Sequence, residues 1–218
     1  MLDIDGTLID SMYAHVWSWR DAFRGVGVDV PTWKIHRAIG MGGDRLVEAV
    51  TNAAVEDSLG DEVRNRQSEF YQRLSGRLTP THGAVELLEA LKAHGLKVAL
   101  ASSGSRDDTE DALDLLGTRH WIDATISGDD TGATKPDMEP VHRAVVSVDG
   151  SHALVVGDAV WDMQSARRAG HVGVGLLTGG IARCELLAAG AAEVYEDPAA
   201  LVAVLTDVLH GPHHGLPR

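Results

Sequence analysis

The sequence predicts an α/β protein built on a doubly wound, Rossmann-like parallel sheet, with an all-helical segment inserted after the first strand. From residue 84 onward, short apolar runs that suit strands alternate with amphipathic segments that suit helices. The apolar runs are continuous, which is typical of parallel strands covered on both faces. Between residues 12 and 77 no segment alternates like a strand, and this block indicates about four helices.

Composition narrows the class of protein. The 218 residues are 44% hydrophobic, which suffices for one folded domain with a sizeable insertion. A net charge of -13 argues against a nucleic-acid partner, because phosphate backbones select basic surfaces. The single cysteine, Cys184, favours a reducing compartment, and we find no membrane span or signal peptide. We therefore expect a cytoplasmic monomer or homodimer with no nucleic-acid or membrane partner.

The inserted block is expected to begin with a helix at Met12, where Val16, Trp19 and Phe23 form one apolar stripe. Three further helices are predicted at residues 31–39, from residue 44, and at residues 61–74. Asp44 is expected to cap the helix that follows it. The predicted domains are a core of residues 1–11 and 78–218 and a helical cap of residues 12–77.

The rest of the core is predicted to alternate regularly. Helices are expected at residues 84–94, 107–116, 138–146, 162–169, 181–189 and 198–209, and strands at residues 97–101, 124–127, 153–156, 172–177 and 193–195. Ligands of such sheets bind at the carboxyl ends of the strands. Ser102 and Asp158 each follow a strand directly and are expected to meet Asp5 at that edge. The cap enters beside the same edge and is well placed to act as a lid.

The first acidic motif predicts a metal and catalytic site. Residues i and i+2 of a strand share a face, so Asp3 and Asp5 are expected to converge where the chain turns at Gly6. Two carboxylates at such close range repel each other unless a cation lies nearby, and Mg²⁺ prefers oxygen ligands. A calcium loop of the EF-hand kind is excluded, because the twelfth position counted from Asp3 is Ala14.

The first strand is short. Only Met1 and Leu2 precede Asp3, whereas strands usually run about 5–6 residues. A stub would leave backbone groups unpaired on its expected neighbours, the strands at 97–101 and 153–156. We therefore expect the natural chain to begin several residues upstream, with an apolar run leading into Leu2.

Four motifs stand in a fixed order along the chain. They are Asp3-x-Asp5-Gly6-Thr7, then Ser102-Ser103-Gly104, then Lys135 within Gly-Ala-Thr-Lys-Pro, and finally Gly157-Asp158 with Asp162 four residues on. This set, together with the inserted helices, resembles the haloacid dehalogenase superfamily phosphatases that carry a helical cap. The chain is most similar to the group of phosphoglycolate phosphatase and β-phosphoglucomutase, over nearly its whole length. The resemblance implies Mg²⁺-dependent hydrolysis of a small phosphorylated metabolite.

The resemblance also implies a role for each carboxylate. Asp3 would be the nucleophile that forms an aspartyl-phosphate. Asp5 would protonate the leaving alcohol and later take a proton from the attacking water. Mg²⁺ would be held by Asp3, the backbone carbonyl of Asp5, and Asp158. Asp162 would orient Lys135 or a water molecule at the metal.

The phosphoryl group would be bound by the remaining motif residues. The Ser102 hydroxyl and the backbone N–H groups of Ser103 and Gly104 would orient its oxygens. Lys135 would neutralise part of its charge and so take part in catalysis alongside Ser102.

Two alternatives stay open at this stage. A phosphomutase would need cationic anchors in the cap for a second phosphate, for which Arg45 and Lys34 are candidates. A phosphate-binding protein without turnover would have lost Asp3 or Asp5, and both are present. The presence of Asp5 also argues against dehalogenases, which lack this acid, and against the phosphonate-cleaving members, which carry a small residue there.

Two histidines of the cap, His15 and His36, are interpreted as solvated or core side chains rather than as groups that face the cleft.

Overall fold

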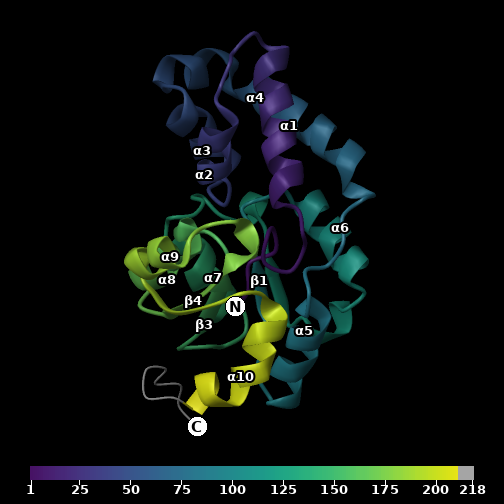
Figure 1. Ribbon diagram of the computed structural model, residues 1–218, viewed down its shortest axis with the longest axis vertical. Helices are drawn as coiled ribbons and strands as arrows, with labels where there is room; N and C mark the ends of the chain where they lie inside the picture. The colour runs from purple at the N-terminus through teal and green to yellow at the C-terminus, as the bar shows by residue number, and fades with distance from the viewer. Residues whose placement is uncertain (211–218) are drawn as a thin grey trace.

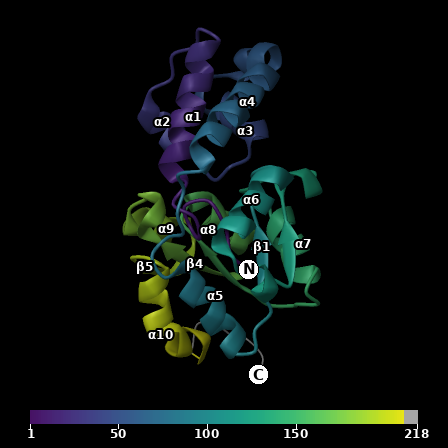
Figure 2. The same ribbon diagram turned by 90° about the vertical axis from the view of Figure 1, so that its right-hand side faces the viewer.

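The computed structural model describes residues 1–210 and places an all-helical cap above an α/β core (Figures 1 and 2). The cap helices are α1 (Met12–Gly25), α2 (Thr32–Ala38), α3 (Gly43–Val50) and α4 (Ala53–Ser75). They enclose their own hydrophobic cluster, with Phe23 of α1, Leu46 of α3 and Val63 of α4 fully buried in it. The predicted core extends to residue 218, and residues 211–218 lie outside the described part.

Two predictions about the ends of cap helices were wrong. Helix α4 begins at Ala53, well before the predicted Asp61, because the Asn52 side chain caps it by accepting a hydrogen bond from the Val55 N–H at 3.1 Å. Helix α3 is preceded by Gly42, so Asp44 is not its N-cap. The Asp44 carboxylate lies in the first turn and accepts a hydrogen bond from the Thr134 hydroxyl of the core at 2.7 Å.

The core sheet is parallel throughout its described strands, as predicted. These are β1 (Ala99–Ala101), β2 (Ala124–Ile126), β3 (Leu154–Gly157), β4 (Val172–Leu176) and β5 (Ala191–Tyr195). Strand β1 pairs with β2, and β3, β4 and β5 pair in that order. Leu2 bridges to Leu100 on one side and to Val156 on the other. The first segment of the chain therefore joins the two groups of strands into one sheet.

Backbone hydrogen bonds fix this first segment from both sides. The Leu2 N–H donates to the Ala99 carbonyl at 2.9 Å, and the Ala101 N–H donates to the Leu2 carbonyl at 3.0 Å. On the other side the Asp3 N–H donates to the Val156 carbonyl at 2.9 Å. Its two predicted neighbours are thus confirmed, and Asp3 is held by strands that lie far along the chain.

Helices cover both faces of the sheet. They are α5 (Ala84–Ala93), α6 (Arg106–Leu116), α7 (Glu139–Val146), α8 (Val160–Arg168), α9 (Arg183–Ala189) and α10 (Pro198–His210), with short 3-10 helices at Arg119–Trp121, Gly128–Asp130 and Leu177–Gly179. Leu100 and Val156 point into a cluster with α5, α6 and α10, whereas Val155 packs against α7 and α8. Burial on both faces explains why the strands are continuous apolar runs. No helix within residues 1–210 combines the length and the apolarity needed to cross a membrane.

Candidate active site

The predicted acidic residues meet at the carboxyl edge of the sheet, beneath the cap. Ser102 follows the last residue of β1, and Asp158 follows the last residue of β3. Asp3 lies between them because the first segment pairs with both strands. All three side chains are buried. Lys135 reaches the same point from the loop that precedes α7, and it is also buried.

The chain can turn beside these acids only because glycine allows it. Gly6 adopts a φ of +77°, and a Cβ at this position would lie 2.3 Å from Oδ2 of Asp158. A Cβ at Gly179 would lie 2.0 Å from the same oxygen. The Thr7 hydroxyl donates to the other oxygen, Oδ1, at 2.8 Å. Backbone from two loops therefore forms a close cradle around the Asp158 carboxylate.

Lys135 is the cation of this cluster. Its ammonium donates to the Asp3 carboxylate and, at 3.0 Å, to the Ala101 carbonyl. It also lies 2.8 Å from Oδ1 of Asp162, whose Oδ2 accepts the Ala159 N–H at 3.0 Å. Burial opposes the charged form, but the carboxylates of Asp162 and Asp3 outweigh it and raise the pKa of Lys135. Lys135 is therefore charged, and Asp162 holds it in position.

One lysine does not balance the charge of the three buried carboxylates of Asp3, Asp158 and Asp162. Burial raises the pKa of Asp3 to about 7 despite the charge of Lys135, and the charges of Asp162 and Asp5 contribute to the rise. Burial, followed by the charge of Asp3, also raises the pKa of Asp158. Oxygens of Asp3, Asp158 and Asp162 lie within 4.8 Å of one another, and Oδ2 of Asp158 has no hydrogen-bond partner. This donor set of hard oxygens fits Mg²⁺.

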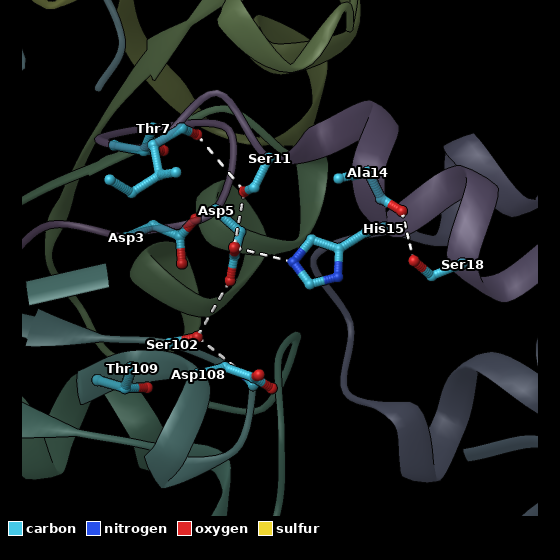
Figure 3. Close-up of polar contacts among 12 residues, drawn as sticks. Asp3, Asp5, Thr7, Ser11, Ala14, His15, Ser18, Ser102, Asp108 and Thr109 are labelled. Carbon is cyan, nitrogen blue, oxygen red and sulfur yellow. Dashed lines mark hydrogen bonds and ion pairs between the residues drawn. The ribbon is translucent and has the colours of Figure 1, made fainter. Parts of the chain in front are cut away.

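The Asp5 carboxylate belongs to a different network, shown in Figure 3. Its Oδ1 accepts the Ser11 hydroxyl at 2.7 Å and lies 2.9 Å from Nε2 of His15, and its Oδ2 accepts the Ser102 hydroxyl at 3.3 Å. Burial would raise the pKa of Asp5, but the charge of His15 and the hydrogen bonds from His15 and Ser11 lower it to about 2. With its side chain engaged in this way, Asp5 has its backbone carbonyl left to offer a metal, as the resemblance implies.

The interpretation of His15 as a solvated or core side chain was wrong, because His15 lines the cleft. His15 lies in the first turn of α1, faces Asp5 and stacks on the Tyr71 ring of α4, with the ring centroids 4.1 Å apart. Burial opposes protonation of His15, but the charge of Asp5 raises its pKa. His36 contacts the Gly179 carbonyl of the core at 2.9 Å. The spacing from Ser11 to His15 was an available signal, because residues i and i+4 share one helical face.

The predicted phosphate-binding loop also contacts the cap. The Gly104 N–H donates to the Ser102 hydroxyl at 2.9 Å, so in this conformation it is already paired. The Ser103 hydroxyl donates to the Gly40 carbonyl at 3.1 Å. The Gly104 N–H would have to exchange this partner to bind a phosphoryl oxygen, whereas the contact of Ser103 involves its hydroxyl and not its backbone N–H. Their role in binding phosphate stays a prediction.

A cleft of about 220 Å³ is lined by the carboxylates of Asp3 and Asp5 and by residues of the cap. Asp3 and Asp5 line its floor, and His15 and Trp19 of α1 line its upper wall. Another cavity, of about 240 Å³, lies at the amino ends of β1 and β3 and contains none of these carboxylates. The 220 Å³ cleft is therefore the candidate substrate site.

Comparison with known proteins agrees with this geometry. A family model described as haloacid dehalogenase-like hydrolase matches residues 1–170. Validoxylamine A 7'-phosphate phosphatase of Streptomyces hygroscopicus is 29% identical over 192 residues, which cover 82% of this chain and 84% of that protein. Phosphoglycolate phosphatase of Aquifex aeolicus is 29% identical over 179 residues, which cover 78% and 80% of the two chains.

Solved structures share the whole fold. A hydrolase from Pseudomonas syringae is 36% identical, with a TM-score of 0.90 over 95% of this chain and 97% of that one. A β-phosphoglucomutase from Clostridium difficile, 19% identical, has a TM-score of 0.77 over 90% and 89% of the two chains, which shows likeness of fold alone. These matches confirm the resemblance predicted from the four ordered motifs, and the curated relatives are phosphatases as expected.

Proposed function

The chain belongs to the haloacid dehalogenase-like hydrolase family, and we propose that it hydrolyses a small phosphate monoester through an aspartyl-phosphate on Asp3. The observation that carries the proposal is the buried ion pair between Lys135 and Asp3, next to the carboxylates of Asp158 and Asp162. A nucleophile that must attack a phosphate dianion needs such fixed positive charge beside it. The phosphatase names of the curated relatives support the same reaction.

In the first step, an oxygen of Asp3 forms a bond to phosphorus as the bond to the leaving oxygen breaks. Lys135 contacts Asp3 and would neutralise part of the phosphoryl charge. The Ser102 hydroxyl contacts Asp5 and would orient a phosphoryl oxygen bound between Asp3 and Asp5. Mg²⁺, which Asp3, Asp158 and the Asp5 carbonyl would hold, supplies further positive charge for the phosphoryl oxygens. Asp5 delivers the proton that the leaving alcohol needs.

In the second step, water attacks the phosphorus of the aspartyl-phosphate, and the bond to Asp3 breaks to release inorganic phosphate. Asp5 takes the proton of this water. The lowered pKa of about 2 keeps Asp5 ionised in the free enzyme, so its carboxylate is free to accept this proton. Because Asp5 is ionised, the proton that it delivers in the first step would come from His15, whose pKa is raised and whose Nε2 lies 2.9 Å from Oδ1.

The phosphomutase alternative receives no support from the cap. Lys34 and Arg45, its candidate anchors, are both exposed, and neither lines the cleft. Nε of Arg45 also lies 3.9 Å from the Asp44 carboxylate. The alternative of phosphate binding without turnover is disfavoured, because Asp3 and Asp5 both line the cleft. A small phosphorylated metabolite is thus the proposed partner, and the cytoplasm is the proposed compartment.

If Asp5 is the general acid, the activity lost on its replacement should depend on how much the leaving group needs a proton. Asp5→Asn keeps the backbone carbonyl, so Mg²⁺ affinity should hold, but proton delivery should fail. Activity on an alkyl phosphate should fall by about 10²–10⁴, and activity on p-nitrophenyl phosphate by less, because p-nitrophenol leaves without protonation. Phosphate release from both substrates, with saturating Mg²⁺, measures this. Equal losses on the two substrates would remove Asp5 from the acid role.

The crowded carboxylates predict that Mg²⁺ stabilises the fold more at high pH. Without metal, Asp3 has a folded pKa of about 7 against an ordinary value of 3.8. Between these values the folded protein binds more protons than the unfolded chain, so stability falls as pH rises. Mg²⁺ at one fixed concentration, about 100 times its Kd at pH 8, should raise Tm by about 5–10 °C at pH 8 and by less at pH 5, where protonated carboxyls bind the ion more weakly.

Thermal unfolding in EDTA and in Mg²⁺ at the two pH values tests this prediction. Asp158→Ala is the matched variant, since it removes one carboxylate of the cluster and should lose most of the gain from Mg²⁺. An equal rise in Tm at both pH values would contradict the link to Asp3.

A further inference from the structure

Beyond the phosphoryl site, the described residues that line the cleft offer no free cation. Among its lining residues in the described part of the chain, the basic side chains are Arg64 of α4 and His15 of α1. Each of them is already paired with carboxylates of the protein. The charge balance of the cleft therefore bears on which leaving groups it can accept.

Arg64 is neutralised within its own helix. Its Nη1 donates to both carboxylate oxygens of Glu56, at 2.8 and 3.1 Å, and to the Gly43 carbonyl at 3.1 Å. Its Nη2 donates to Asp61 at 2.8 Å. Two carboxylates thus flank one guanidinium, whose side chain is 29% exposed. An anionic substrate group would have to displace one of these partners to gain the charge of Arg64.

Apart from Arg64 and His15, the ionisable groups of the cleft are the carboxylates of Asp3, Asp5 and Asp108. His15 is paired with Asp5 at 2.9 Å. Asp108 also lines the cleft, and its carboxylate accepts the Ser105 hydroxyl at 2.7 Å. A second carboxylate or phosphate on the substrate would face Asp5 and Asp108 without a cation of its own. Like charges at short range and an unpaired buried charge are both costly.

The uncharged walls suit a hydroxylated carbon skeleton. Trp19, Ile39, Met41 and Leu46 of the cap provide apolar contact. Gln67 and Ser68 of α4 place an amide and a hydroxyl beside them. We propose that the leaving group is a neutral, hydroxylated alcohol of the polyol or sugar class, so that the phosphoryl group is the only anionic group of the substrate. This inference rests on the proposed phosphatase function.

A matched pair of substrates tests the inference directly. 2-Hydroxyethyl phosphate and 2-phosphoglycolate have almost the same size and differ in whether the end distant from the phosphate is a hydroxymethyl group or a carboxylate. The ratio of kcat/KM for the pair is independent of how much of a preparation is folded, because both substrates meet the same enzyme. The wild type should prefer 2-hydroxyethyl phosphate by about 10- to 100-fold.

Variants of α4 test the cause of that preference. Glu56→Gln combined with Asp61→Asn frees the charge of Arg64 without changing any residue that lines the cleft. The double variant should shift the ratio at least about tenfold toward 2-phosphoglycolate. Glu62→Gln is the matched control, because Glu62 lies on the same helix but pairs with Arg66, which does not line the cleft. It should leave the ratio unchanged.

The outcomes separate this inference from the proposed function. Preference of the wild type for 2-phosphoglycolate would overturn the inference and leave the phosphatase function standing. An unchanged ratio in the double variant would remove Arg64 from the explanation and overturn the charge argument. Absence of Mg²⁺-dependent phosphate release from both substrates and from p-nitrophenyl phosphate would overturn the phosphatase function, and the inference with it.

Discussion

Replacement of Asp3 by asparagine should abolish turnover. The amide is a poor nucleophile and a weaker metal ligand, and we expect a loss of roughly 10⁴–10⁶ in kcat, the scale seen for other lost nucleophiles. The fold should persist, because the amide has the shape of the carboxylate and can still accept a hydrogen bond from Lys135. Steady-state phosphate release with saturating Mg²⁺ measures the loss, and circular dichroism checks the fold.

The same variant tests the covalent step. Acid-quenched wild type should carry one phosphoryl group on the peptide that contains Asp3, and Asp3→Asn should carry none. Asp10→Asn is the control, because Asp10 is an exposed acid in the same segment and should retain activity. An Asp3→Asn enzyme with a tenth of wild-type activity would exclude Asp3 as the nucleophile.

Replacement of Lys135 by methionine should cost both activity and stability. Removing one partner of a buried ion pair leaves uncompensated charge and typically costs about 3–5 kcal/mol of the free energy of unfolding. Here the Lys135 side chain is 1% exposed, and its ammonium contacts the carboxylates of Asp3 and Asp162. Loss of its charge at the transferring phosphoryl group should lower kcat by a further factor of about 10²–10³.

Urea unfolding in EDTA measures the stability change. The destabilisation should shrink at pH 5, where the buried carboxyls take up protons instead of staying charged. Lys97→Met is the matched control, since Lys97 is exposed and forms a surface ion pair with Asp123 at 3.3 Å, worth about 0–1 kcal/mol. A Lys135→Met protein as stable as this control would show that the buried pair contributes little.

Much of the core was predictable because one strong rule governs it. Parallel strands buried on both faces leave long apolar runs, and their carboxyl ends meet at a single edge. Ser102 and Asp158 could therefore be assigned to that edge from the position of each after its strand. Asp3 could be added because the strands at 97–101 and 153–156 were its expected neighbours, and the backbone hydrogen bonds agree.

The cap was less predictable, for two physical reasons. The start of α4 at Ala53 depends on one side-chain cap from Asn52 and on packing against α1. Val55 and Leu59 stand at i, i+4 spacing with Val63 and pack with it, a helical signal that the predicted start at residue 61 left out. Contacts between the cap and the core depend on how these two domains are oriented relative to each other, and the periodicity of the sequence does not encode that orientation. His15 at Asp5 and Asp44 at Thr134 both belong to this second group.

The pairing of the first segment has a consequence for the order of folding. Asp3 gains its position only after segments around Ala99 and Val156 have come together on either side of it. Both pairings close long loops. Contacts of such high sequence separation form late, because the chain loses the entropy of loop closure before the contacts contribute any favourable free energy. We therefore expect the carboxylate proposed to start the reaction to be among the last groups to be fixed. During refolding, recovery of activity should lag behind recovery of helical signal, and catalytic competence would report completed folding.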